Sequence, residues 1–226
     1  MREIVLDTET TGLDPAVGHR IVEVAGLEMI NHLPTGKSFH RYINPQRDMP
    51  EGAERIHGLS ESFLADKPVF AEIAQDLTTF LGDATLIIHN AAFDMAFFNA
   101  EFSLLGLPIL PPERARDTVE MARKRFPSAQ ASLDALCRRF GIDNSARTYH
   151  GALLDCELLA EVYLQLIGGR QPQLTLAGAR KQEPSIEGIG SAGAVQPARP
   201  HRATPEELEA HAAMLAKLTD PLWQRN

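Results

Sequence analysis

The sequence is short of cysteine and has no long hydrophobic run. Its two cysteines, Cys137 and Cys156, lie in apolar patterns typical of helices and form no C-x-x-C motif. This usage favours two reduced, inert thiols rather than a disulfide framework. The apolar segment at the amino terminus is too short for a signal peptide, and no run approaches the ~18 residues of a membrane span. We therefore expect a cytoplasmic protein without a membrane segment.

The sequence also lacks the basic excess that is typical of nucleic-acid-binding proteins. The formal net charge is −8, and residues 1–168 carry 15 Lys and Arg against 24 Asp and Glu. Taken alone, this balance argues against a nucleic-acid partner. Carboxylates that hold divalent cations would reverse the local charge and attract phosphate. Composition therefore leaves a nucleic-acid substrate open.

Residues 1–168 show the periodicities of an α/β domain. We expect Asn90 and Ser132 to cap helices and Gly141 to end one. The order of elements predicts a mixed central sheet flanked by helices, beginning with an antiparallel meander of three strands. The expected strands are residues 3–7, 20–30, 38–43, 84–89 and a short one after 115; the expected helices are 69–81, 90–105, a segment ending before Pro127, 133–140 and 151–167.

The composition changes after residue 168. Residues 169–203 are rich in glycine and proline and contain no aromatic residue, which predicts a flexible linker. Residues 204–226 then begin with Thr204-Pro205-Glu206-Glu207, a capping box with proline at the first helical position. The helix that follows presents an apolar stripe formed by Leu208, Ala212, Leu215 and Leu218. Because one short helix cannot bury such a stripe alone, we expect it to dock on another surface.

The first candidate site is the segment Asp7-Thr8-Glu9 at the end of the first strand. Side chains alternate between the faces of a strand, so Asp7 and Glu9 point the same way. Their repulsion would be relieved by a divalent cation, because hard cations prefer carboxylate oxygens. The alternative is a solvated strand end. The following turn at Gly12 would let backbone approach a ligand closely.

The second candidate is Asp94, in the first turn of an expected helix. An acid there is also explained by the helix dipole. Phe97 and Phe98 follow three and four positions later, which places Asp94 near the apolar face. We expect it to point toward the strand that ends in Asp7.

The third candidate is the pair His150 and Asp155. Asp155 shares a helix face with Leu159, Val162 and Leu166, and a carboxylate on a buried stripe needs a partner or a metal. His150 precedes the helix, and histidine is the side chain best suited to act as a general base at neutral pH. The alternative for such a histidine is a capping or surface role.

These residues together fit two-metal phosphoryl chemistry. Four convergent carboxylates, Asp7, Glu9, Asp94 and Asp155, would hold two divalent cations about 4 Å apart, and His150 would accept a proton from the attacking water.

The same motifs resemble those of the DEDDh 3′→5′ exonuclease superfamily, over about residues 2–168. The first motif is Asp7-Thr-Glu9-Thr-Thr-Gly, the second His89-Asn-Ala-Ala-Phe-Asp94, and the third His150 followed by Asp155. The resemblance implies a ribonuclease-H-like exonuclease fold, Mg²⁺ or Mn²⁺ as cofactor and a DNA 3′ end as substrate. It also implies that Asp7, Glu9 and Asp155 lie at the substrate. The stretch Ile56-His57-Gly58-Leu59 resembles a family loop that contacts the terminal nucleotide, which implies substrate contacts for His57 and Glu51. Asp117 recurs in the family as a structural helper.

Within the superfamily, the sequence is similar to the epsilon, or proofreading, subunits of bacterial DNA polymerase III. The similarity rests on Asn90-Ala-Ala-Phe-Asp94, Ser132-Leu-Asp-Ala-Leu-Cys137, and Arg147-Thr-Tyr-His150 with the segment after it. It implies that residues 204–223 bind the catalytic alpha subunit of the polymerase. Residues 171–176, with Gln171, Leu174 and Leu176, fit the pattern of sliding-clamp ligands, although they are also compatible with ordinary linker sequence.

Two other functions remain open at this point. An RNA-trimming or repair exonuclease of the same superfamily would share the active site but would generally lack the linker and docking helix. A non-catalytic scaffold of the polymerase would need none of the buried acids, so the complete set of five residues argues against it.

Overall fold

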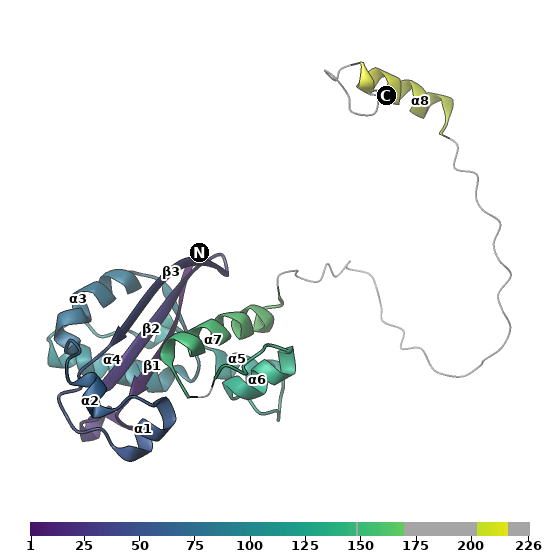
Figure 1. The fold of residues 1–226 in the computed structure, drawn as a ribbon. Helices are drawn as coiled ribbons and strands as arrows, with labels where there is room; N and C mark the ends of the chain where they lie inside the picture. The colour runs from purple at the N-terminus through teal and green to yellow at the C-terminus, as the bar shows by residue number, and fades with distance from the viewer. Residues whose placement is uncertain (148, 170–202, 217–226) are drawn as a thin grey trace, which may run out of the picture. The chain divides into compact units, whose positions relative to one another are not determined.

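Five strands form a mixed sheet in the computed structural model, which describes residues 1–147, 149–169 and 203–216 (Figure 1). The strands are β1 (Arg2–Thr10), β2 (Ile21–Ile30), β3 (Leu33–Tyr42), β4 (Thr85–Ile88) and β5 (Ala115–Asp117), in the order β3-β2-β1-β4-β5. β2 pairs antiparallel with both β1 and β3, whereas β4 is parallel to β1 and to β5. The expected mixed sheet and its opening meander are thus confirmed.

The helices also follow the expected order. They are α3 (Phe70–Leu81), α4 (Ala91–Leu104), α5 (Thr118–Arg125), α6 (Leu133–Phe140), α7 (Ala152–Leu166) and α8 (Pro205–Leu215). Two short helices between β3 and α3 were not predicted: α1 (Glu51–His57) and α2 (Glu61–Leu64). The strand expected at 38–43 begins earlier, because a two-residue turn at Asn31 and His32, both with positive φ, continues β2 directly into β3. That part of the strand was not predicted because proline and glycine, here Pro34 and Gly36, are unfavourable in strands. Pro34 is tolerated because β3 is an edge strand.

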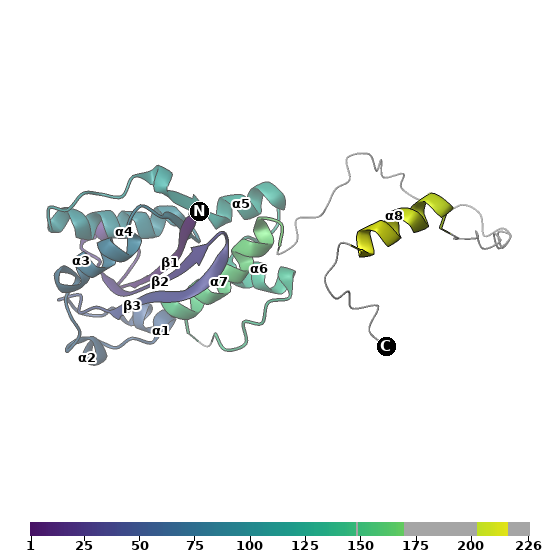
Figure 2. The same ribbon diagram turned by 90° about the horizontal axis from the view of Figure 1, so that it is seen from above.

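Helices cover both faces of the sheet (Figure 2). Alternation along β1 sends Ile4 and Leu6 into one core with residues of α3 and α4, while Val5 enters a second core with residues of α6 and α7. All three side chains are fully buried. β1 is therefore the central strand of two hydrophobic layers, and the acids at its end are placed by both.

Most local capping signals act as expected. Ser132 caps α6 through the backbone N–H of Ala135, Gly141 ends that helix in the left-handed region, and Thr204 forms the capping box with Glu207. Asn90 occupies the N-cap position of α4, as expected, but its side chain makes no capping bond within the described residues. The Asp117 carboxylate caps α4 instead.

Asp117 in fact serves two helices. It accepts from the N–H groups of Asn90 (3.2 Å) and Ala91 (3.1 Å) at the start of α4. It also accepts from Val119 (2.7 Å) in its own helix, α5. A carboxylate at two helix amino termini is favoured by both macrodipoles. This arrangement ties β5, α4 and α5 together beside the site.

The chain divides into two compact units, residues 1–176 and 177–226. Of the second unit the structure describes residues 203–216, which contain α8. Leu208 and Met214 of this helix are 58% and 50% exposed. The expected end of the stripe at Leu218 and the peptide 171–176 lie outside the described residues. Across the described ranges, no helix has both the length and the apolar character needed to cross a bilayer.

Buried side chains of α4 should contribute far more to stability than its exposed ones. Phe98 is fully buried on α4, so Phe98→Ala is expected to lower the free energy of unfolding by about 3 to 5 kcal/mol. Leu104 of the same helix is 69% exposed, so Leu104→Ala should change it by less than about 0.5 kcal/mol. Urea unfolding followed by far-UV circular dichroism measures both, and equal effects would contradict this assignment of the core.

Candidate active site

Two acids project from the carboxyl end of β1 on the face that α7 covers. Asp7 and Glu9 alternate in phase with Val5, which packs in the core on that side. Burial, followed by the negative charges of Asp94 and Glu9, raises the pKa of Asp7 well above its usual value. Burial, followed by the charges of Asp155 and Glu23, raises the pKa of Glu9 to about 8. Both shifts have the direction expected of acids that compete for one volume.

Asp94 reaches the same place from the first turn of α4. Its side chain is 2% exposed and accepts a hydrogen bond of 2.7 Å from the Thr8 hydroxyl of β1. Burial raises the pKa of Asp94 to about 7, although the bond from Thr8 opposes the shift. The carboxylate points toward β1, as its helical position predicts.

The third segment supplies Asp155 and His150. Asp155 is 4% exposed in the first turn of α7, and the His150 side chain, just before that helix, is half exposed. Ligand atoms of Glu9, His150 and Asp155 all lie within 4.8 Å of one another. Residues separated by more than 140 positions in the sequence therefore share one small volume.

Arg147 is a site residue to which the sequence analysis assigned no role. Its guanidinium binds both oxygens of Asp155, at 2.5 and 2.6 Å, and one oxygen of Asp134 at 3.0 Å. It also donates to His150 Nδ1 at 2.9 Å, which leaves the proton of a neutral ring on Nε2. A cation at Asp155 would have to share these oxygens with Arg147 or displace it. The only sequence signal was its place in the Arg147-Thr-Tyr-His150 stretch.

The donor set fits divalent metal. Asp7, Glu9, Asp94 and Asp155 offer hard carboxylate oxygens, the ligands that Mg²⁺ and similar cations prefer. The raised pKa values of Asp7, Glu9 and Asp94 show that these acids are poorly compensated by the protein alone. A bound cation supplies the missing positive charge.

A cleft of about 590 Å³ adjoins the carboxylates, with Glu9, Ile56, His57 and Phe93 among the residues that line it. His57 is 5% exposed, and burial lowers its pKa. Glu51 lies exposed at the start of α1; the cleft borders its neighbours Pro50 and Gly52.

Gly12 also lines the cleft, and the His19 ring packs closely against it. A Cβ atom at this position would lie 2.3 to 2.5 Å from atoms of the His19 ring. A side chain at position 12 would therefore force the His19 ring to move, and the close approach of this backbone to a ligand stays a prediction.

Comparisons with known proteins agree with this geometry. The RNase_T exonuclease family model matches residues 4–163. Exonuclease X in complex with 5′-overhanging duplex DNA is 26% identical, with a TM-score of 0.56 over 74% of this chain and 91% of that one. The nuclease domain of 3′hExo, a DEDDh family member, has the same fold, with a TM-score of 0.63 at 18% identity over 74% of this chain and 91% of its own. The fold is that of these exonucleases, and the family match over residues 4–163 makes the chain a metal-dependent 3′→5′ exonuclease.

Relatives with similar sequences show to which group of exonucleases the chain belongs. DNA polymerase III subunit epsilon of Escherichia coli (strain K12) is 44% identical over 95% of this chain and 92% of its own length. The same subunit of Rickettsia felis is 58% identical over 76% of each chain. The chain belongs to the exonuclease family and, within it, to the DNA polymerase III epsilon subunits. Its activity is that of the family, 3′→5′ exonucleolytic proofreading in DNA replication.

The carboxylate cluster should make stability depend on pH when metal is removed. Asp7, Glu9 and Asp94 have raised pKa values, so the folded state binds more protons than the unfolded state. Stability should therefore fall as pH rises from about 6.5 to 8.5, by about 1 to 2 kcal/mol through Glu9. The window starts at about pH 6.5 because His57 and His89 have lowered pKa values in the folded state. Below that pH the unfolded state binds more protons at these histidines, so they make stability rise with pH and oppose the effect of the acids.

Urea unfolding in EDTA at both ends of that window measures the slope. Glu9→Gln should reduce it, and saturating Mg²⁺ should reduce it in the wild type. A slope that is identical in Glu9→Gln and unaffected by Mg²⁺ would show that the acids are not in conflict.

Proposed function

We propose that Asp7, Glu9, Asp94 and Asp155 hold two divalent cations, Mg²⁺ or Mn²⁺, at which the chain hydrolyses the 3′-terminal phosphodiester of DNA and releases 5′-mononucleotides. The supporting observation is that ligand atoms of Glu9, Asp155 and His150 lie within 4.8 Å of one another, while the half-buried Asp7 and the buried Asp94 interact electrostatically with these acids. When bound, the cations would stabilise charge on the phosphate and lower the pKa of the attacking water.

Other side chains of the site have separate roles in proton transfer, in orienting the acids and in holding the substrate. His150 is the general base, and its Nδ1 becomes available when Arg147 donates elsewhere. Thr8 orients Asp94 through its hydroxyl. His57, at the buried end of α1, and the apolar walls of the cleft hold the terminal nucleotide. Glu51 remains a predicted contact at the mouth of the cleft.

The substrate is a frayed 3′ end rather than a stable duplex. Unpaired bases cost less to withdraw from the stack than paired ones, so mispaired termini are preferred. Residues 1–168 carry more acids than bases, which suggests weak DNA binding by the exonuclease domain alone. Tethering to the polymerase would raise the effective concentration of the DNA end.

The carboxyl-terminal part supplies that tether. Residues 1–168 form the exonuclease domain, 169–203 the linker, and 204–226 a segment that binds the alpha subunit through 204–223. Leu208 and Met214 of α8 are exposed and available to a partner. Residues 171–176 would bind the sliding clamp.

Loss of the metal ligands should abolish the reaction. On a 5′-labelled single strand with Mg²⁺, the wild type should produce a stepwise ladder, and Asp7→Ala/Glu9→Ala should not. His150→Ala should lower kcat by about 10² to 10⁴. Asp66→Ala, which removes an exposed acid outside the three motifs, serves as the control. A ladder from the double variant, or in excess EDTA, would contradict the mechanism.

Removal of residues 169–226 should separate catalysis from assembly. The truncated chain should retain the ladder on a single strand but no longer co-purify with the alpha subunit. Replacing Gln171, Leu174 and Leu176 by alanine in the full chain should weaken clamp binding alone. Co-purification of the truncated chain with the alpha subunit would show that the tail is not the binding segment.

A further inference from the structure

Glu23 is a buried acid beside the candidate metal site that belongs to none of the exonuclease motifs. It lies on β2 directly opposite Glu9 in the β1–β2 ladder and is 3% exposed. Its Oε2 accepts from the backbone N–H of Ala152 at 3.2 Å, and its Oε1 lies 2.7 Å from Nε2 of His40. Because both oxygens are bonded to protein groups, Glu23 can hold those groups in position, and its charge also raises the pKa of Glu9.

The bond to Ala152 supplies what the start of α7 lacks. Ala152 is the first residue of the helix, and the N-cap position is Gly151, which has no side chain with which to cap. The first N–H groups of a helix need acceptors from elsewhere. The Glu23 carboxylate is the acceptor for the N–H of Ala152, although the two residues are 129 positions apart in the sequence. The helix amino terminus is thereby attached to the strand that pairs with β1.

This attachment determines where Asp155 lies. Asp155 follows Ala152 by three residues, and its own N–H bonds to Gly151 at 2.9 Å, so the first turn is regular. A helical turn is stiff, with a rise of about 1.5 Å per residue. Holding Ala152 on β2 therefore holds Asp155 opposite Glu9. His150 is held at the same junction by its N–H, which bonds to the Ile56 carbonyl at 3.0 Å.

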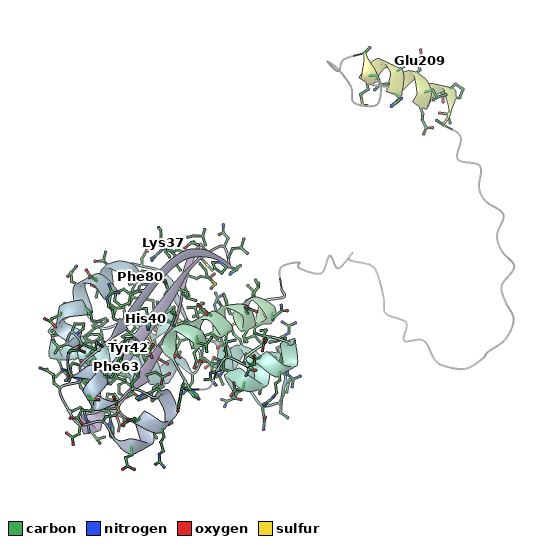
Figure 3. The ribbon with its side chains drawn as sticks, viewed as in Figure 1. Lys37, His40, Tyr42, Phe63, Phe80 and Glu209 are labelled. Carbon is green, nitrogen blue, oxygen red and sulfur yellow. The ribbon has the colours of Figure 1, made fainter. Side chains whose placement is uncertain are left out.

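Glu23 is itself braced from β3. The His40 ring packs edge-on against Tyr42, with centroids 4.9 Å apart, and Tyr42 packs against Phe63 at 5.0 Å. Figure 3 shows His40, Tyr42 and Phe63 in succession along this side of the sheet. The aromatic row limits the motion of His40 and so of the Glu23 carboxylate.

We propose that Glu23 is a positioning residue for the metal site, which docks the amino terminus of α7 on β2 and so sets the separation of Asp155 and His150 from Glu9. The inference rests on the proposed role of Glu9 and Asp155 as metal ligands. The docking of α7 requires the reach and the acceptor of Glu23, whereas the charge of Glu23 acts separately by raising the pKa of Glu9.

Calorimetric titration of the metal-free full chain with Mn²⁺ tests the proposal. Glu23→Gln keeps both reach and acceptor, so it should keep α7 docked and lose far less Mn²⁺ affinity than Glu23→Asp, although it removes a charge near Glu9. Glu23→Asp keeps the charge but is one methylene shorter, and Glu23→Ala lacks both; each should bind about 10-fold more weakly or worse. Amide hydrogen exchange at Ala152 should be faster in these two variants. The control Glu28→Ala removes another buried acid of β2, bonded to Arg2, and should lower stability without changing the Mn²⁺ affinity.

The outcomes distinguish failure of the ligand assignment from failure of the positioning role. A wild type that does not bind Mn²⁺ overturns the ligand assignment itself. A wild type that binds, with Glu23→Ala equally tight, overturns the positioning role. Weak binding by Glu23→Gln together with tight binding by Glu23→Asp would show that charge is what matters, which also overturns it. If Glu23→Ala does not fold, the glutamine and aspartate variants make the same comparison.

Discussion

Desolvation of the carboxylates at the carboxyl end of β1, followed by their mutual repulsion, is the constraint on which the site depends. Loss of hydration and the neighbouring charges together raise the pKa values of Asp7, Glu9 and Asp94. Protons, a guanidinium or divalent cations can each relieve the conflict. In the described structure, Arg147 neutralises Asp155, while the acids of β1 and α4 keep raised pKa values. The scaffold therefore holds a high-energy arrangement that metal binding would stabilise.

Two hydrophobic cores offset the cost of this arrangement. β1 is buried on both faces, by α3 and α4 on one side and by α6 and α7 on the other. Polar contacts then fix the orientation of each segment: Thr8 bonds to Asp94, Glu23 to Ala152, and Asp117 to the start of α4. Apolar burial supplies stability without direction, whereas these bonds supply direction. Both are needed to keep three distant segments in one volume.

Much of the fold could be predicted because its signals are local. Alternating and helical periodicities located the sheet and α3 to α7, and the caps at Ser132 and Thr204 are set by residues within one turn. The start of β3 was missed because Pro34 and Gly36 are poor strand residues, tolerated here at a sheet edge. Helices α1 and α2 have seven and four residues, too short for a clear period. Asn90 was assigned a capping role by residue type, but Asp117 performs it from another element.

The sequence by itself determined the acids, their strand and helix positions, and the family they indicate, because these depend on residue type and short spacing. Strand alternation was enough to place Asp7 and Glu9 on one face. Only the tertiary structure decided how the acids are compensated and held. The Arg147 guanidinium binds the Asp155 carboxylate, and Glu23 accepts a hydrogen bond from Ala152, which lies 129 positions later in the sequence. Spacing along a chain carries no distance between segments that meet only after folding, so such partners become visible only when the sheet and α7 are packed together.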